Sequence, residues 1–179
     1  MEKKARIVVL GGGFGGLTAA QSLDRYLRKN RNVEIILINR TPNQVYLTQL
    51  HEIAGNRIPE DGVLYSLEAA LDQTRVKLVV DEIHKIDVKN RKLYGVDNEY
   101  SFDYLILACG SEPAFFDIPG MKENAFTLWS HEDAIKIRHH IVSMFEMASA
   151  EQDAEKRKEY LTFVVGGGGY TGIEMIGEL

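Results

Sequence analysis

Two glycine-rich turns are the segments of this chain of 179 residues that are best suited to chemistry. In a Gly-x-Gly-x-x-Gly turn, the first glycine lets the chain reverse tightly, the second lets the backbone approach a pyrophosphate, and the third lets a helix pack on a strand. Phosphate oxygens then face the N–H groups of the helix N-terminus. The first turn consists of Gly11, Gly12, Gly13, Phe14, Gly15 and Gly16, and the second is marked by Gly167, Gly169 and Gly172.

The elements around the first turn have the order of a βαβ unit. An apolar run, Ile7–Leu10, precedes the turn, and apolar residues recur at helical spacing after it, so we expect a strand and a crossover helix. The apolar run Val33–Ile38 predicts a second parallel strand. The sequence therefore predicts a dinucleotide site at the first turn.

The second predicted strand ends at Asn39 and Arg40, close to the place where such folds carry a ribose-binding acid about 20 residues after the turn. Asn39 could accept a ribose hydrogen bond through its amide oxygen, and Arg40 could stack on adenine or contact a phosphate. The alternative is that Asn39 is a turn residue leading into Thr41-Pro42-Asn43.

The next part of the chain mixes short helical and strand patterns. We expect short helices at Leu47–Ala54 and Leu64–Leu71. Alternation of polar and apolar residues predicts an antiparallel excursion before the chain returns to the buried sheet. The strand-like segments are Val76–Val80, Glu82–Asp87, Lys92–Val96 and Tyr104–Leu107.

A linker is expected where Pro113 and Pro119-Gly120 bracket an irregular stretch. An apolar helix beginning near His131 and a charged stretch through Lys158 follow. The run Tyr160–Val165 then predicts a strand that enters the second glycine turn. The chain ends at Leu179, inside the helix that this turn opens, so we expect only the beginning of a second domain.

The composition bounds the function. With 45% hydrophobic residues, 26% charged residues and a net charge of −5, the chain reads as a globular protein, and its acidity argues against nucleic-acid binding. Cys109 is the single cysteine, which excludes a disulfide framework within the chain and favours a reducing, cytoplasmic setting. No run approaches the roughly 20 apolar residues of a membrane span, so we expect any membrane contact to be peripheral, at the inner face of the cell membrane.

Four motifs occur in an order that resembles the two-dinucleotide flavoprotein reductases, and most closely the type II NADH dehydrogenases, which pass electrons from NADH through FAD to a quinone. The motifs are Gly11–Leu17, Tyr46–Gly55 with Thr48 and His51-Glu52, Phe102–Ser111, and Gly169–Glu174 with Gly177–Leu179.

The resemblance implies an α/β protein with a three-layer ββα FAD/NAD(P)-binding Rossmann-like fold, a parallel central sheet and a small antiparallel excursion. It implies an FAD domain over residues 1–112, a linker over 113–122 and the opening of a truncated NADH domain over 123–179. The first glycine turn would hold the FAD pyrophosphate, and the second would hold NADH. The other implied FAD contacts are Asn39 and Arg40 at the adenosine, the backbone of Ile83 at adenine, Thr48 near the flavin, and Ala108, Cys109 and Gly110 alongside the cofactor.

Cys109 and Glu174 bear on mechanism. A lone cysteine outside a Cys-x-x-x-x-Cys helix does not support disulfide reduction, and we expect Cys109 to be a small buried thiol. Glu174 resembles the family's glutamate near the nicotinamide and quinone, where a carboxyl group handles a proton; the alternative is an acid favoured by the helix dipole. We expect His51 and Glu52 to be surface or packing residues, and no residues show metal-ligand spacing.

The sequence as a whole predicts the N-terminal portion of a flavin-dependent NADH:quinone oxidoreductase. Later family segments complete the FAD and quinone sites, so we expect this chain alone to be inactive. The alternatives are a dinucleotide-binding protein without turnover and a subunit that completes its FAD site with a partner chain. An apolar strand at Tyr160–Val165 would also favour a homodimer.

Overall fold

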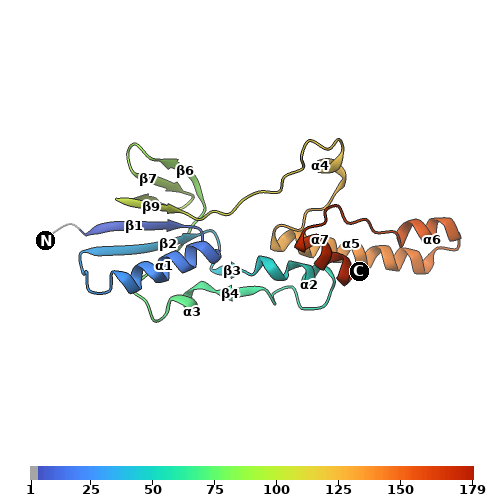
Figure 1. The fold of residues 1–179 in the computed structure, drawn as a ribbon, viewed down its shortest axis with the longest axis horizontal. Coiled ribbons are helices and arrows are strands. Elements are labelled where there is room, and N and C mark those ends of the chain that lie inside the picture. Colours follow the sequence, from blue (N-terminus) through green and yellow to red (C-terminus); the bar gives the residue numbers. More distant parts are fainter. Residues whose placement is uncertain (1–3) are drawn as a thin grey trace. The chain divides into compact units, whose positions relative to one another are not determined.

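Four parallel strands form the central sheet in the order β5-β2-β1-β9 (Figure 1). They are β1 (Ala5–Leu10), β2 (Val33–Asn39), β5 (Lys77–Val80) and β9 (Tyr104–Leu107). The computed structural model describes residues 4–179. The predicted βαβ unit is confirmed, because β1 pairs in parallel with β2 from Ala5↔Val33 to Leu10↔Ile38, and α1 (Phe14–Tyr26) connects them.

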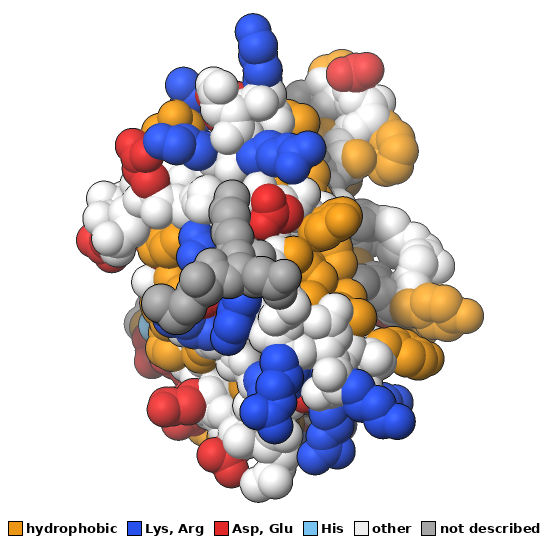
Figure 2. All heavy atoms as spheres, turned by 90° about the vertical axis from the view of Figure 1, so that its left-hand side faces the viewer, with side chains coloured by type: hydrophobic (Ala, Val, Ile, Leu, Met, Phe, Trp, Pro, Cys, Tyr) orange, Lys and Arg blue, Asp and Glu red, His pale blue; other side chains and the backbone are white. Residues whose placement is uncertain are grey.

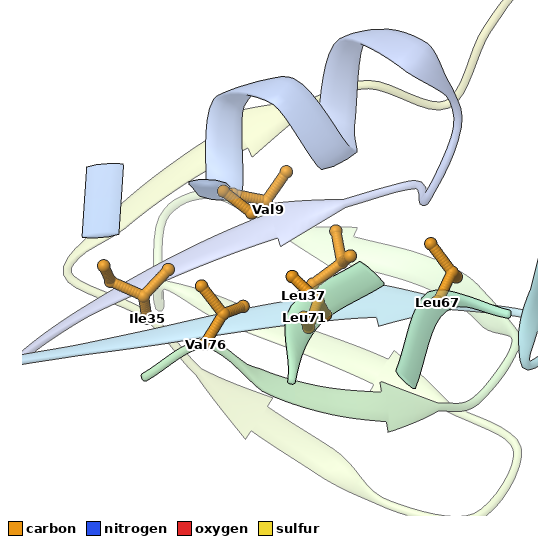
Figure 3. Close-up of a cluster of buried hydrophobic side chains, with 7 residues drawn as sticks. Val9, Ile35, Leu37, Leu67, Leu71 and Val76 are labelled. Atoms are coloured by element: carbon orange, nitrogen blue, oxygen red, sulfur yellow. The ribbon is translucent and has the colours of Figure 1, made fainter. Parts of the chain in front are cut away.

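The alternation of side chains along β1 and β2 divides the core into two layers. Val9, Ile35 and Leu37 point to one face and pack with α1 and with α3 (Leu67–Leu71) (Figure 3). Val8 and Ile36 belong to the cluster on the other face, which includes Leu93 and Phe102. That second face is covered by an antiparallel sheet of β6 (Ile83–Asp87), β7 (Lys92–Gly95) and β8 (Glu99–Ser101). Helices, parallel sheet and antiparallel sheet make the predicted three layers.

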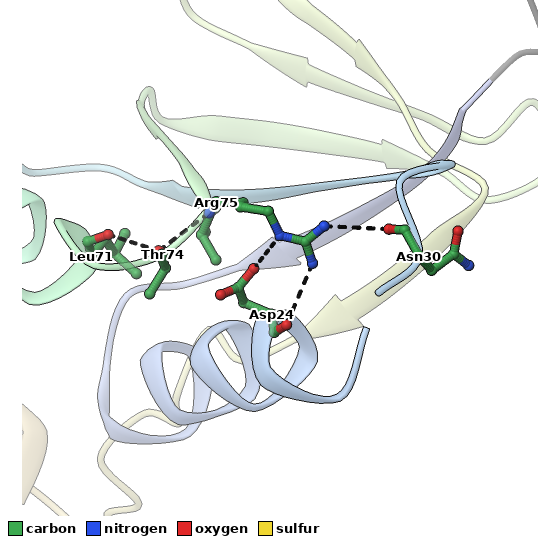
Figure 4. Close-up of polar contacts among 6 residues, drawn as sticks. Asp24, Asn30, Leu71, Thr74 and Arg75 are labelled. Carbon is green, nitrogen blue, oxygen red and sulfur yellow. Dashed lines mark hydrogen bonds and ion pairs between the residues drawn. The ribbon is translucent and has the colours of Figure 1, made fainter. Parts of the chain in front are cut away.

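Arg75 ties the end of α1 to the loop before β5 (Figure 4). Its Nε donates to Asp24 Oδ1 at 2.8 Å, and its terminal nitrogens donate to the backbone carbonyls of Asp24 and Asn30 at 3.4 and 3.3 Å. The side chain of Thr74 donates to the Leu71 carbonyl at 2.7 Å. Because Asp24 is only 8% exposed, the guanidinium supplies the partner that a buried carboxylate requires.

The predicted helix Leu64–Leu71 is wrong in its first turn. Residues Leu64–Ser66 form strand β4, which pairs antiparallel with β3 (Asn43–Val45). The helix begins only after Ser66, whose side chain accepts a hydrogen bond from the Ala69 N–H at 3.2 Å. Pairing with β3 and the serine N-cap together override the helical spacing of the apolar residues.

The described part of the chain divides into two compact units. The first contains residues up to Val45 together with Leu64–Ser111, and the second contains Tyr46–Val63 and Glu112–Leu179. Helices of the second unit are η1 (Leu47–Gln49), α2 (Leu50–Ala54), α4 (Met121–Asn124), α5 (His131–Ala150), α6 (Ala154–Tyr160) and α7 (Tyr170–Glu178). The domain limits at 112 and 122 stay a prediction.

The predicted helix near His131 is confirmed as α5, which begins with a capping box between Ser130 and Asp133. The predicted strand Tyr160–Val165 is wrong: Tyr160 ends α6, and no strand forms before the second glycine turn. A strand needs a neighbour for its backbone hydrogen bonds, and the described part of the chain offers none in this unit. Val164 is accordingly 89% exposed. Within residues 4–179, the helices are too short or too polar to cross a membrane.

Candidate functional site

The first glycine turn lies at the carboxyl end of β1 and is held by backbone contacts on two sides. The N–H of Gly11 donates to the Ile38 carbonyl at 2.8 Å, and Gly11 has a φ of +106°. A Cβ on Gly11 would lie 2.2 Å from the Ala108 carbonyl oxygen, and one on Gly16 would lie 1.8 Å from the Gly11 oxygen. These two positions therefore require glycine for the fold itself.

Gly13 is different, because nothing in the protein demands a glycine there. It is the N-cap of α1 with φ −71° and ψ −171°, values open to any residue, and a Cβ would meet no atom within 4 Å. Gly15 is likewise exposed and open. The absence of side chains keeps the helix N-terminus accessible, and α1 has neither a side-chain cap nor an acidic residue in its first turn. The positive end of the helix dipole is thus left open to an anionic group such as a pyrophosphate.

Asn39 joins the glycine turn to the loop after β2. Its Oδ1 accepts the Gly12 N–H at 2.8 Å, and its Nδ2 donates to the carbonyls of Thr41 and Asn43 at 2.9 and 3.2 Å. The amide uses both its acceptor and its donors within the protein. These contacts are those of a turn residue, which is the second of the two alternatives for Asn39, and the ribose hydrogen bond stays a prediction.

Asp81 supports the same edge of the sheet, and the sequence motifs do not point to it. Its N–H donates to the Asn39 carbonyl at 2.9 Å, and its buried carboxylate accepts from the Tyr100 hydroxyl at 2.6 Å and from the Val96 N–H at 3.0 Å. The hydroxyl of Tyr100 lowers the pKa of Asp81, and the N–H groups of the β7–β8 turn act in the same direction against burial. Burial, followed by the Asp81 carboxylate, raises the pKa of Tyr100. An acid directly after the apolar end of a predicted strand, Val76–Val80, was the signal available in the sequence.

The end of β9 lies beside the first turn. The N–H of Ala108 donates to the Leu10 carbonyl at 2.8 Å, and Gly110 has a φ of +80° with open space around it. Cys109 is exposed, so the predicted buried thiol is wrong. The thiol is exposed because the chain leaves the sheet at Leu107 and no described element covers it. Its Sγ lies 3.7 Å from the Leu10 carbonyl oxygen.

The remaining predicted FAD contacts are distributed over both units. Arg40 is exposed directly after β2. Ile83 begins β6 and packs partly buried against the core under the antiparallel sheet. Thr48 is exposed in η1, which belongs to the second unit.

The second glycine turn repeats the backbone geometry of the first. Gly167 has a φ of +116°, and Gly169 is the N-cap of α7 with φ −75° and ψ 176°. A Cβ on Gly172 would lie 2.1 Å from the Gly167 oxygen, whereas one on Gly169 would meet no atom within 4 Å. Gly167 thus matches Gly11 in its positive φ, Gly172 matches Gly16 in its close backbone contact, and Gly169 matches Gly13 in its open surroundings. The second turn therefore also leaves a helix N-terminus accessible.

Glu174, the predicted catalytic residue, lies on α7 within a cluster of charged side chains. Its Oε2 is 3.4 Å from Nδ1 of His51 on α2, in the same unit. The expectation that His51 is only a surface or packing residue missed this contact, because the two residues are far apart in the sequence.

Figure 2 views the protein from the side where β1 begins, and Lys and Arg side chains lie above and below a hydrophobic patch there. A shallow hollow at this end is lined by Lys4, Ala5, Arg91, Asp103 and Tyr104. It lies at the amino ends of the strands, whereas ligands of open α/β sheets bind outside the carboxyl ends. Among residues 4–179, no three His, Cys, Asp or Glu side chains are grouped to hold a metal ion.

A parallel sheet with a helix layer, an antiparallel layer and a glycine turn after its first strand defines a Rossmann-like dinucleotide-binding fold. Residues 5–179 match the family model described as pyridine nucleotide-disulphide oxidoreductase. The chain belongs to this family. The 179 residues nevertheless contain a single cysteine, so this stretch cannot by itself form the disulfide that the family's name implies.

Two similar curated proteins have the same name. The chain is 33% identical to the type II NADH:quinone oxidoreductase of Staphylococcus haemolyticus and 33% identical to that of Staphylococcus aureus, over 99% of this chain and 44% of each relative. The chain thus spans less than half the length of the curated relatives that it matches.

Solved structures agree on the fold. NDH2 from Plasmodium falciparum matches with a TM-score of 0.83 and 23% identity, over 98% of this chain and 36% of that chain. The sulfide:quinone oxidoreductase of Aquifex aeolicus matches with a TM-score of 0.68 and 20% identity, over 79% of this chain and 32% of that chain.

Proposed function

We propose that this chain is part of a flavin-dependent NADH:quinone oxidoreductase, in which the first glycine turn binds FAD and the second binds NADH. The observation that carries the proposal is the repeated geometry: in each turn, the glycine at the helix N-cap, Gly13 or Gly169, has no steric reason inside the protein to be glycine. The name shared by the curated relatives supports the reaction.

FAD fits the residues of the first turn. The open positions Gly13 and Gly15 let a pyrophosphate approach the backbone, while Gly11, Gly12 and Gly16 fill the protein side of the turn. When bound, FAD would accept a hydride from NADH and pass the electrons to the acceptor. Asn39 fixes the turn through Gly12, and exposed Arg40 is available to the adenosine.

The other proposed FAD contacts are backbone approaches and one hydroxyl. Backbone at Ile83 meets adenine, the hydroxyl of Thr48 meets the flavin end, and the segment of Ala108, Cys109 and Gly110 runs along the cofactor. The open surroundings of Gly110 and the exposure of Cys109 and Thr48 support these roles.

Glu174 is the proposed catalytic residue. Reduction of a quinone by hydride equivalents from NADH requires one further proton, which a positioned carboxyl group can hold and deliver. The half-exposed side chain of Glu174, at 47%, is accessible for this exchange. Gly167, Gly169 and Gly172 place the NADH pyrophosphate at the start of the same helix.

Two glycine variants test the assignment of the two cofactors. Gly13→Ala should weaken FAD binding, and Gly169→Ala should raise the KM for NADH while FAD stays bound, because each methyl group enters space that a phosphate needs. Neither should change the melting temperature, since neither Cβ meets a protein atom. Each variant is the control for the other.

The first assay is flavin absorbance at about 450 nm, a wavelength that the flavin itself sets. The second assay is NADH oxidation with and without a soluble quinone. Both should be run on this chain and on the longest protein that its reading frame encodes. Quinone-dependent NADH oxidation is expected in the longer protein. If neither protein binds flavin, the proposal is refuted. If flavin binds but neither protein oxidises NADH, the result favours a binding protein.

We further propose a cytoplasmic protein that contacts the inner face of the cell membrane peripherally and forms a homodimer. Exposed apolar side chains on the second unit support a pairing surface, namely Val164 at 89%, Ile173 at 62% and Ile176 at 62%. Sedimentation of the purified protein with and without vesicles tests both parts.

A further inference from the structure

Helices α2 and α7 contact each other through two pairs of residues, one pair from each segment, and the members of each pair are one helical turn apart. Glu174 and Glu178 are four residues apart on α7, so their side chains extend from one face. His51 begins the same spacing on α2, and Gly55 follows one turn later. A Cβ on Gly55 would lie 2.5 Å from Cβ of Glu178, so the glycine makes room for α7. The contact is therefore built into both segments.

His51 lies between the two glutamates. Its Nδ1 is 3.4 Å from Glu174 Oε2, and its Nε2 is 4.0 Å from Glu178 Oε1. The side chains of His51 and Glu178 are each 12% exposed, whereas that of Glu174 is 47% exposed. The imidazole is thus enclosed and reaches an accessible carboxylate with one nitrogen only.

Arg57 completes the arrangement on the side of Glu178, and its own side chain is 56% exposed. Its Nη2 is 2.9 Å from Glu178 Oε1 and 3.2 Å from Glu52 Oε1. Glu178 therefore already has a cationic partner in Arg57, and Nδ1 of His51 is left to act on Glu174. Helix α5 packs beside α2, and three of its polar side chains reach the residues that follow α2. Arg138 donates to the Ile58 carbonyl, His131 Nε2 lies 2.5 Å from the Glu60 carbonyl oxygen, and His139 lies 3.3 Å from the Glu60 carboxylate.

We propose that His51 is the positioning residue of Glu174. Its ring draws the Glu174 carboxylate toward α2 and restricts its rotamers, while Glu178 and Arg57 fix the ring from the other side. This inference rests on the proposed function, because the carboxylate that His51 holds is the one assigned to proton delivery. A carboxyl group misplaced by about 1 Å can lose up to about a hundredfold in rate, so the orientation of Glu174 matters to turnover.

Kinetics of three variants test the role. His51→Leu removes both nitrogens and should lower kcat for quinone reduction by about tenfold, with the KM for NADH unchanged. His51→Asn keeps an N–H donor near the place of Nδ1 and should recover kcat to within about threefold of wild type. His139→Leu is the matched control, because it removes an imidazole 3.3 Å from a carboxylate elsewhere in the same unit, and it should behave as wild type.

A double-mutant cycle tests the contact without any activity. Melting temperatures of His51→Leu, Glu174→Gln and the double variant should be non-additive, whereas the cycle of His139→Leu with Glu60→Gln should be close to additive, since that pair is exposed. Additivity of the first cycle would overturn the proposal. Equal kcat values for His51→Leu and wild type would also overturn it.

The two kinds of failure can be told apart. If neither this chain nor the longer protein oxidises NADH while the His51 cycle still shows coupling, the proposed function is refuted and the pair is a structural contact only. If wild-type protein is active and the cycle is additive, the proposed function stands and the positioning role is lost.

Discussion

Replacing Asn39 by aspartate changes one atom type at the residue that shapes the first glycine turn. The oxygen that accepts the Gly12 N–H at 2.8 Å is retained. The second position changes from a donor to an acceptor, yet it faces the carbonyl oxygens of Thr41 and Asn43 at 2.9 and 3.2 Å. Two hydrogen bonds to carbonyl groups are therefore lost, together with a longer one to the Thr41 hydroxyl at 3.4 Å, and a carboxylate oxygen is placed against two carbonyl oxygens that cannot donate.

The cost follows from these contacts. At about 0.5–1.5 kcal/mol for each lost hydrogen bond, the pair contributes about 1–3 kcal/mol, and the unsatisfied carboxylate adds about 1 kcal/mol. We expect Asn39→Asp to lower the free energy of unfolding by about 2–4 kcal/mol at pH 7, measured by urea denaturation. Lowering the pH should reduce the loss, because the introduced carboxyl group, once protonated, could donate again.

The matched control for this substitution is Asn30→Asp. The exposed Asn30 side chain accepts the Asn32 N–H through its oxygen at 3.0 Å, which an aspartate would preserve. We expect a change within about 0.5 kcal/mol there. If Asn39→Asp proved as stable as wild type at pH 7, the assignment of the amide as a two-sided link would be refuted.

Three further predictions concern the core, the turn and the response to acid. Leu37→Ala should cost about 2–5 kcal/mol in denaturant unfolding, because this side chain is 0% exposed, whereas Tyr26→Ala, at 83% exposure, should stay near wild type. Gly16→Ala should cost about 3 kcal/mol or more in the same assay, because its Cβ would overlap the turn's backbone; stability equal to wild type would contradict the turn geometry. Because the pKa of Asp81 is lowered in the folded state, its contribution is present above the unfolded pKa and is lost as the pH falls through the folded value. Tyr100→Phe should flatten this acid dependence, and an unchanged curve would contradict the assignment.

The residues around the first turn predict the βαβ unit well, because both relevant signals are local. Buried parallel strands read as continuous apolar runs, and a Gly-x-Gly-x-x-Gly turn leaves few other ways to connect such a strand to a helix. β1, α1 and β2 accordingly lie where the sequence predicts them. Gly11 and Gly16 have steric reasons for being glycine, and the sequence pattern contains both.

The errors occur where a tertiary partner decides. Leu64–Ser66 has apolar spacing that suits a helix, but β3 supplies a strand partner and Ser66 supplies a cap. Tyr160–Val165 has strand composition but no described neighbour to pair with. Cys109 follows an apolar run and reads as buried, yet the chain has already left the sheet. In each case the outcome depends on which residues distant in the sequence pack against the segment.

The two glycine turns and the His51–Glu174 pair show why cofactor binding is easier to predict than proton chemistry. Pyrophosphate binding depends on backbone geometry, which a short motif encodes, and both turns adopt it. Placing an acid depends on side chains that meet across helices, as His51 on α2 and Glu174 on α7 do. His51 belongs to the segment Tyr46–Val63, an excursion of the chain that connects β3 to β4. At the base of this excursion, the Tyr46 N–H donates to the Val63 carbonyl at 2.9 Å. Variation within this excursion should therefore alter the position of the Glu174 carboxylate, and with it the proposed proton delivery, and leave the conformation of both glycine turns unchanged.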